Sequence, residues 1–279
     1  MTYSPALFRP GLLVALLMVL FMALASCAPM EPVMRPPTAE EGPLAWETFV
    51  NRSLAARDQS GPIRVSATLR YEDPSGESTR VSALLWGNGP SRGLYPLRLD
   101  LQASMGITVA KIREDASSFL AYSPDEKTAY THAGKDRSLL SFGVPIPVSL
   151  GDLSLLLAGQ AGTLLLPPGA SAGHAPGVGS LTGRGIAFAV PDAPLPGIIE
   201  LSPAGTLLSW RDYSNKSWVM EFAMNPHNPL EPSKVVVNHP SGHSATITVK
   251  SVERLATPFN SEQLALNLPD GTARKPLGQ

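Results

Sequence analysis

The chain has 279 residues, and its 22 Lys and Arg against 23 Asp and Glu leave a formal net charge of −1 at pH 7. This balance, with no cluster of Lys and Arg, argues against binding to nucleic acid. The only cysteine is Cys27, so an internal disulfide is excluded and the folded part must be stable through its hydrophobic core alone.

The N-terminal segment predicts export from the cytoplasm. Arg9 precedes the uncharged apolar run 11–25, whose fifteen residues are too few to span a bilayer as a helix, which needs about 20. They match the apolar region of a signal peptide. The run ends in Leu24-Ala25-Ser26-Cys27, which resembles the lipobox of bacterial lipoproteins. A membrane anchor with an incidental cysteine is the alternative.

The lipobox resemblance implies cleavage before Cys27, with acyl groups added to its thiol and to its new amine. The acylated Cys27 would hold the chain on membrane lipid and could not act as a nucleophile. In the lipoprotein family an Asp after the cysteine favours the inner membrane, and Ala28 stands here, so the resemblance favours the outer membrane, facing the periplasm. The predicted organisation is a signal peptide at 1–26, a lipidated proline-rich spacer at 27–43, extended by about 3 Å per residue, and a folded domain at 44–279.

The folded domain begins with a helix, followed by strands. A helix is expected over about 43–56, with Leu44, Phe49, Val50 and Leu54 near one apolar face. After Gly61-Pro62 apolar and polar residues alternate, which is typical of antiparallel strands with one wet face. The strands are predicted at 63–71, 79–86, 97–102, 107–113, 118–123 and 127–131.

The middle of the chain departs from this alternation. Gly143-Val144-Pro145-Ile146-Pro147 leads into a short helix with Ser149 as its N-cap and Gly159 at its end. Its apolar stripe consists of Leu150, Leu153, Leu156 and Leu157. The segment 160–180 is mostly Gly, Ala, Pro and Ser and predicts a long, mobile connection. Strands are then expected at 181–190, 197–202, 206–213, 217–224, 233–239 and 244–253, which gives an α+β domain.

This order of elements resembles the LolA/LolB superfamily over about residues 45–255. The main match is Gly143-Val144-Pro145-Ile146-Pro147 before a leucine-rich helix, and weaker matches are Ala103-Ser104-Met105-Gly106, Trp218-Val219-Met220-Glu221-Phe222 and Pro232. The resemblance implies a strongly curved antiparallel sheet, an incomplete β-barrel, with helices covering its open side around an apolar cavity for acyl chains. The chain departs from the LolB branch in the insertion 160–180 and in a tail with Phe259, Leu264, Leu266, Leu268 and Pro269.

The resemblance also implies roles for individual residues. Leu150, Leu153, Leu156 and Leu157 would cover the cavity, and Met105 would protrude from a loop that hands lipoproteins to the membrane. Alternatively, Met105 continues the apolar face of Leu97, Leu99 and Leu101. Three aromatic residues could line the cavity or be ordinary core residues: Tyr122, Trp210 and Trp218.

Signals of catalysis are weak. Gly89-Pro90-Ser91-Arg92-Gly93 matches the string around a hydrolase serine, but that chemistry needs a strand-to-helix turn, whereas strands are expected on both sides. His239 and His243 are four residues apart, yet Pro240 and Gly242 exclude a helix that would place both on one face. No catalytic residue, metal site or cofactor is therefore expected.

Two functions remain from this sequence. The first is an outer-membrane-anchored lipoprotein that binds acyl chains and receives or inserts lipoproteins or lipids, with the acyl chains of other lipoproteins and a periplasmic LolA-like carrier as partners. The alternative is a structural or assembly lipoprotein of a cell-envelope complex, with a filled core and no lipid transfer.

Overall fold

The computed structural model describes residues 38, 40–57, 61–89, 96–132, 138–176, 180–213 and 218–277. The lipobox, Leu24-Ala25-Ser26-Cys27, lies outside these residues, as do most of the spacer and Ser91. Within the described part, every helix is too short or too polar to cross a membrane.

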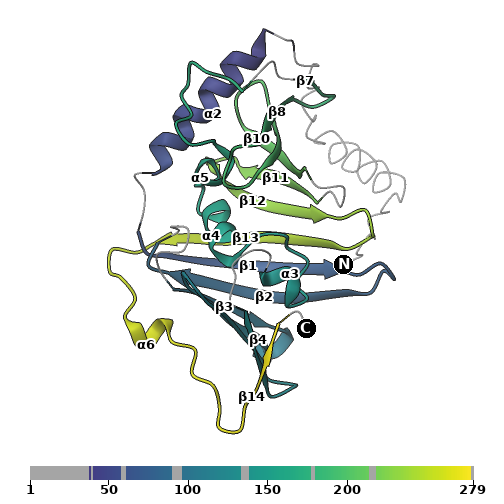
Figure 1. Ribbon diagram of the computed structural model, residues 1–279, viewed down its shortest axis with the longest axis vertical. Coiled ribbons are helices and arrows are strands. Elements are labelled where there is room, and N and C mark those ends of the chain that lie inside the picture. The colour runs from purple at the N-terminus through teal and green to yellow at the C-terminus, as the bar shows by residue number, and fades with distance from the viewer. Residues whose placement is uncertain are drawn as a thin grey trace, which may run out of the picture. The chain divides into compact units, whose positions relative to one another are not determined.

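Fourteen strands form one open, curved sheet, which confirms the expected incomplete barrel (Figure 1). Six strands from the first half of the chain make one meander: β1 (Ile63–Glu72), β2 (Ser78–Gly87), β3 (Leu97–Gln102), β4 (Thr108–Glu114), β5 (Phe119–Ser123) and β6 (Thr128–His132). The second meander contains β7 (Ser180–Leu181), β8 (Ile186–Val190), β9 (Gly197–Leu201), β10 (Leu207–Asp212), β11 (Val219–Asn225), β12 (Asn228–Asn238) and β13 (Ser244–Arg254).

The two meanders join where β1 pairs with β13. All strand pairs are antiparallel except one, in which the last strand, β14 (Ala273–Pro276), runs parallel to β6 at the edge of the sheet. Within each meander, strands that are consecutive in sequence are neighbours in space, whereas β6 and β7 lie toward opposite ends of the sheet. The long-range pairing of β1 with β13 unites the two halves in one sheet.

The predicted alternation is confirmed by burial. On β1, Ile63, Val65, Ala67 and Leu69 are at most 3% exposed, whereas Arg64 and Arg70 face solvent. Successive side chains of a strand point to opposite faces. We call the face that bears Val65 the inner face and the face that bears Arg64 the outer face.

The first helix, α2 (Glu41–Arg57), lies where a helix is expected but buries a different face. Leu44 is 60% exposed and Leu54 39% exposed, so the predicted apolar stripe is wrong for both leucines. The helix instead buries Trp46, whose ring lies 5.4 Å from that of Phe188. Small residues share the buried side of the helix and allow close packing: Gly42, Ala45, Ser53 and Ala56.

The segment 160–180 is not the unstructured connection that its composition predicts. It begins with α5 (Gly162–Leu165), and Leu164, Leu165 and Leu166 are at most 1% exposed. A Cβ on Gly162 would lie 2.2 Å from that of Ser53, which shows how closely α5 packs on α2. The three leucines are therefore part of the core.

Helices and tail occupy opposite faces of the first meander. α3 (Ser138–Ser141) and α4 (Leu150–Leu157) belong to the segment on the inner face. The tail after β13 passes through α6 (Ser261–Leu264) and ends in β14 (Figure 1), and it contacts the outer-face residues Arg64 and Trp86. Asn88 fixes the tail through both atoms of its amide, since Nδ2 donates to the Phe259 carbonyl at 2.8 Å and Oδ1 accepts from the Phe259 N–H at 2.6 Å. The Arg98 guanidinium donates to the Ala265 carbonyl.

Candidate apolar cavity and its helical cover

An apolar cavity lies between the inner face of the sheet and α4. Its twelve lining residues are all aliphatic. The sheet contributes Val65, Ala67, Leu69, Ala83, Leu85, Leu99, Leu101 and Ile247, and the segment above it contributes Val144, Ile146, Leu153 and Leu157. The volume is about 20 Å³, close to the space that one water molecule needs. The cavity is therefore too small for an acyl chain in this structure, and binding requires the cover to move.

The cover helix α4 forms as its sequence predicts. The Ser149 side chain accepts a hydrogen bond from the Asp152 N–H at 3.0 Å, and Gly159 follows the helix with φ +77°. All eight helical residues are buried, so α4 is enclosed on every side and has no single buried stripe.

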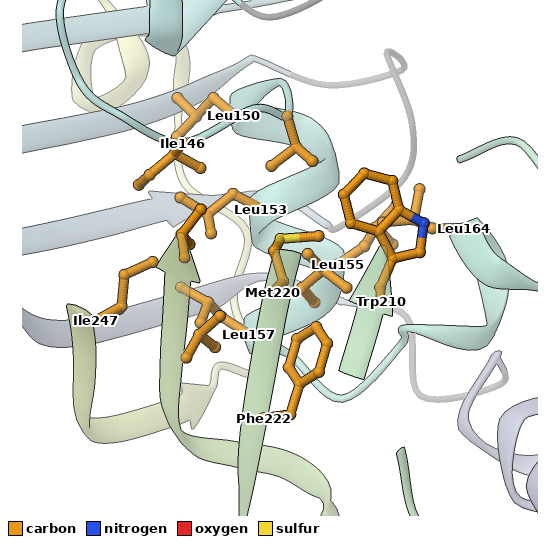
Figure 2. Packing of buried hydrophobic residues seen from close by; sticks show 14 of the residues in the cluster. Ile146, Leu150, Leu153, Leu155, Leu157, Leu164, Trp210, Met220, Phe222 and Ile247 are labelled. Atoms are coloured by element: carbon orange, nitrogen blue, oxygen red, sulfur yellow. The ribbon is translucent and has the colours of Figure 1, made fainter. Parts of the chain in front are cut away.

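The four leucines of the predicted stripe divide between two surroundings. Leu153 and Leu157 line the cavity, whereas Leu150 and Leu156 are buried but do not line it. The structure adds Leu155, which is fully buried in the same core cluster as Trp210 and Met220 (Figure 2). The prediction that this helix covers the sheet holds, but the cavity-facing set is smaller than predicted.

The N-terminal end of the cover is held by Glu114, at the end of β4. One carboxylate oxygen accepts from the Gly151 N–H at 2.9 Å, and the other accepts from the Leu150 N–H at 3.1 Å and from the Ser138 hydroxyl at 2.9 Å. Burial raises the pKa of Glu114 above its ordinary value of 4.5, with a further upward contribution from the negative charge of Asp152, although the three hydrogen bonds oppose this rise. The carboxylate thus ties β4, α3 and α4 together.

The C-terminal end of the cover is held by Arg254, at the end of β13. Its Nη2 donates to the Ala158 carbonyl at 2.8 Å, and its Nη1 lies 2.5 Å from the Glu231 carboxylate of β12. Gly159 lies so close to β12 that a Cβ would be 3.1 Å from the Leu230 carbonyl oxygen. Polar groups therefore fix both ends of α4, while only aliphatic contacts lie beneath its middle.

Met105 lies at the tip of the connection between β3 and β4. It belongs to the short helical turn Ser104–Gly106, has φ +60°, and is 93% exposed, while Ile107 beside it is 57% exposed. The alternative that Met105 continues the apolar core face is therefore wrong. The tip extends from β3, whose Leu99 and Leu101 line the cavity. Its role at a membrane stays a prediction.

The three aromatic candidates are core residues. Tyr122, Trp210 and Trp218 are 8%, 2% and 4% exposed, and none of them lines the cavity. The Trp218 ring packs against the His239 ring at 4.5 Å. The prediction that these side chains line the cavity is not met. Trp210 and Trp218 belong to the second meander, whereas Tyr122 lies on β5 opposite Lys111, on the face away from the buried Ala121 and Ile112.

His239 and His243 lie in the hairpin between β12 and β13. The His239 N–H donates to the His243 carbonyl at 3.0 Å, which closes the turn. Among the described residues, no three His, Cys, Asp or Glu side chains gather closely enough to hold a metal ion.

Sequence reasoning missed both charged residues that hold the cover. Glu114 could have been noticed, because it falls on the apolar register of β4 after Ala110 and Ile112. Arg254 gives no such signal, since its contact with Ala158 joins residues 96 positions apart.

Comparison with known proteins finds likenesses among solved structures and none in sequence. No family model matches the chain, and no curated protein matches its sequence. A solved structure of a DUF1329 family protein from Desulfovibrio piger matches with a TM-score of 0.50 and 11% identity, covering 80% of this chain and 99% of that chain. A LolA superfamily protein from Nitrosomonas europaea matches with a TM-score of 0.49 and 8% identity, covering 76% and 94%.

A domain described as outer membrane lipoprotein-sorting, from Vibrio parahaemolyticus, has a TM-score of 0.46 and 11% identity, covering 81% of this chain and 97% of that chain. At these identities the likeness concerns the fold alone. The class that the fold defines is an open, curved sheet with a helical segment over its inner face.

Proposed function

We propose that the protein is a lipoprotein of the outer membrane, anchored through acylated Cys27 and facing the periplasm. It binds acyl chains between its sheet and α4, and receives or inserts lipoproteins or lipids at that membrane. The observation that carries the proposal is the all-aliphatic cavity lining that β1, β2, β3 and β13 form beneath a separate helical cover. This role needs no catalytic group and no cofactor.

Binding requires α4 and the segment before it to move away from the sheet. Gly143 and Gly159 flank the moving part, and both have positive φ, at +94° and +77°. Each buried methylene contributes about 0.8 kcal/mol, so ten of them contribute about 8 kcal/mol. Opening separates three hydrogen bonds that involve charged side chains, two to Glu114 and one from Arg254. Each costs about 1–3 kcal/mol. Burial of one acyl chain can thus offset the opening of the cover.

The direction of acyl-chain transfer depends on the same balance between apolar burial and opening of the cover. An acyl chain held by a LolA-like carrier would move into this cavity if its burial here is slightly more favourable, and would leave toward the membrane near the exposed Met105. The C-terminal direction of β3 leads from the cavity wall to that tip, which gives the chain a short path to the membrane surface.

A specific observation favours a second candidate function. The cavity of about 20 Å³ is nearly filled, as expected of a structural or assembly lipoprotein that acts through its surface on a cell-envelope complex. The two candidates differ in one property, which is whether the cover opens for an acyl chain.

Mass spectrometry of the purified mature chain tests the proposal, with Cys27→Ser to remove its own acyl groups. We expect co-purified lipid with this protein and much less with Ala83→Leu, which adds carbon atoms to the cavity wall. Ser82→Leu, which adds a leucine to the outer face of the same strand, is the matched control and should retain lipid. A folded protein without lipid would favour the structural candidate.

The anchor is tested separately in cells by labelling with palmitate. Cys27→Ala should leave an unlabelled precursor that is not attached to the membrane through lipid. A variant that is still labelled and still fully processed would contradict the lipoprotein assignment.

A further inference from the structure

A second hollow lies beside the cover, on the surface of the molecule. It is a groove of about 470 Å³ formed by the β5–β6 hairpin, the end of α3 and strand β14. In contrast to the closed cavity, it is open and contains polar groups of both charges. Its position is set by the C-terminal tail, because β14 pairs with β6 and contributes Lys275 to the wall.

One side of the groove suits an anion. Within the described part of the chain, the Lys275 ammonium and the hydroxyls of Ser123 and Ser141 have no hydrogen-bond or ion-pair partner. An ammonium group and two hydroxyls supply only donors to an incoming oxyanion such as a phosphate. These groups are therefore available to a phosphodiester.

The other side of the groove suits a cation. The Glu126 carboxylate accepts a hydrogen bond from the Tyr130 hydroxyl, which raises the pKa of Tyr130 above its ordinary value of 10.0. The Tyr130 ring lies 5.8 Å from the Phe142 ring in an edge-on arrangement. A carboxylate beside two aromatic rings attracts an ammonium group by charge and by cation–π interaction.

The groove and the cavity meet along the chain at Gly143. Phe142 and Gly143 line the groove, whereas Val144 and Ile146, directly after them, line the cavity. Gly143 has φ +94°, and it is one of the two glycines that flank the cover. A ligand with an acyl chain under the opened cover can therefore place a polar end in the groove.

We propose that this groove binds the phosphoethanolamine headgroup of a phospholipid whose acyl chain occupies the apolar cavity. The phosphate contacts Lys275 and the serine hydroxyls, and the ammonium group contacts Glu126 and Tyr130. This inference rests on the proposed function and narrows it, because the diacylglycerol group on a lipoprotein cysteine carries no phosphate. Free phospholipid is then the preferred ligand.

Isothermal titration calorimetry of the mature chain with Cys27→Ser tests the inference with two probes. They are dihexanoyl phosphatidylethanolamine and dihexanoylglycerol, which share their acyl chains and differ in the headgroup. We expect the phospholipid to bind about tenfold more tightly, because charge-assisted hydrogen bonds form only with its headgroup. Lys275→Gln and Glu126→Gln should each remove most of this preference and leave the affinity for dihexanoylglycerol unchanged.

Lys250→Gln, which changes an exposed lysine on β13, is the matched control and should preserve the preference. Equal affinity for both probes, or an unchanged preference in Lys275→Gln, would overturn the headgroup site and leave the acyl cavity standing. Competition by free phosphoethanolamine at equal concentration would overturn the phospholipid as the source of the headgroup, because the groove would then bind the phosphate ester equally well without the lipid. Failure of both probes to bind would overturn the proposed function together with the inference.

Discussion

The two meanders of the sheet bury their inner faces in different ways. Under β8–β11 the space is filled by large rings, with the Trp46 ring tilted against that of Phe188 at 5.4 Å and Trp210 only 2% exposed. Under β1–β3 the cavity lining is entirely aliphatic and meets a helix that is fixed at its ends by Glu114 and Arg254. One half is thus filled by large rings, whereas the other meets its cover through aliphatic contacts, which is the arrangement that the proposed opening requires.

The largest effect is expected from a ring in the filled half. Trp210→Ala should reduce the free energy of unfolding by about 4 kcal/mol, because removing a buried Trp leaves a large void. Chemical denaturation measures this loss. Acyl-chain binding by the protein that remains folded should be unchanged, and a loss of less than about 1 kcal/mol would show that the second meander is not tightly packed.

The cover should tolerate charge poorly on its cavity side. Leu153→Glu is expected to destabilise the domain by about 3 kcal/mol, since it buries a carboxylate without a partner, and to reduce lipid uptake. Leu84→Glu on the outer face of β2, at a position that is 39% exposed, is the control and should change stability little. Equal melting temperatures for Leu153→Glu and the parent protein would contradict the placement of α4.

Glu114 should make the attachment of the cover depend on pH. Its pKa is raised in the folded state, so the stability that it contributes is complete below its unfolded value of 4.5 and is lost as the pH rises through the folded value. Glu114→Gln loses acceptor capacity toward Leu150, Gly151 and Ser138, and should be less stable by about 2 kcal/mol in acid. Chemical denaturation from acid pH up through the folded pKa of Glu114 should show that the difference in free energy of unfolding between the two proteins shrinks as the pH rises. A difference that grows would contradict the assignment.

The smallest effect on stability is expected at the exposed tip. Met105→Glu should change the free energy of unfolding by less than about 0.5 kcal/mol, because the side chain is 93% exposed. The variant should bind lipid normally but deliver it to liposomes more slowly. Ser104→Glu, which places the same charge one residue earlier, is the control. Equal rates of lipid delivery by the two variants would contradict a specific role of Met105 in transfer.

Much of the fold was predictable because its signals are local. The alternation along β1 and β3 gave strands within one or two residues, and Ser149 and Gly159 marked both ends of α4. The predictions failed at positions where contacts with residues far along the chain determine which side chains are buried. On α2, Trp46 rather than Leu44 faces inward because it packs against Phe188 of β8. Three leucines of a Gly-rich segment are buried in the core because that segment packs against α2.

The site was less predictable than the fold. The sequence indicated an apolar inner face and a leucine-rich cover, but not that they close to about 20 Å³. The fixing of the cover depends on pairs 37 and 96 residues apart, from Glu114 to Gly151 and from Arg254 to Ala158. No local pattern encodes such contacts, and the polar groove is likewise formed only when β14 returns to pair with β6.

Photo-crosslinking with a diazirine-labelled fatty acid tests the opening of the cover most directly. The mature chain with Cys27→Ser is labelled in solution, digested and mapped by mass spectrometry. The account predicts adducts on both walls of the cavity, on β1 or β3 near Val65 and Leu99 and on α4 near Leu153 and Leu157. Adducts confined to the surface around Met105, with neither wall labelled, would show that the cover stays closed and would contradict acyl-chain binding in this cavity.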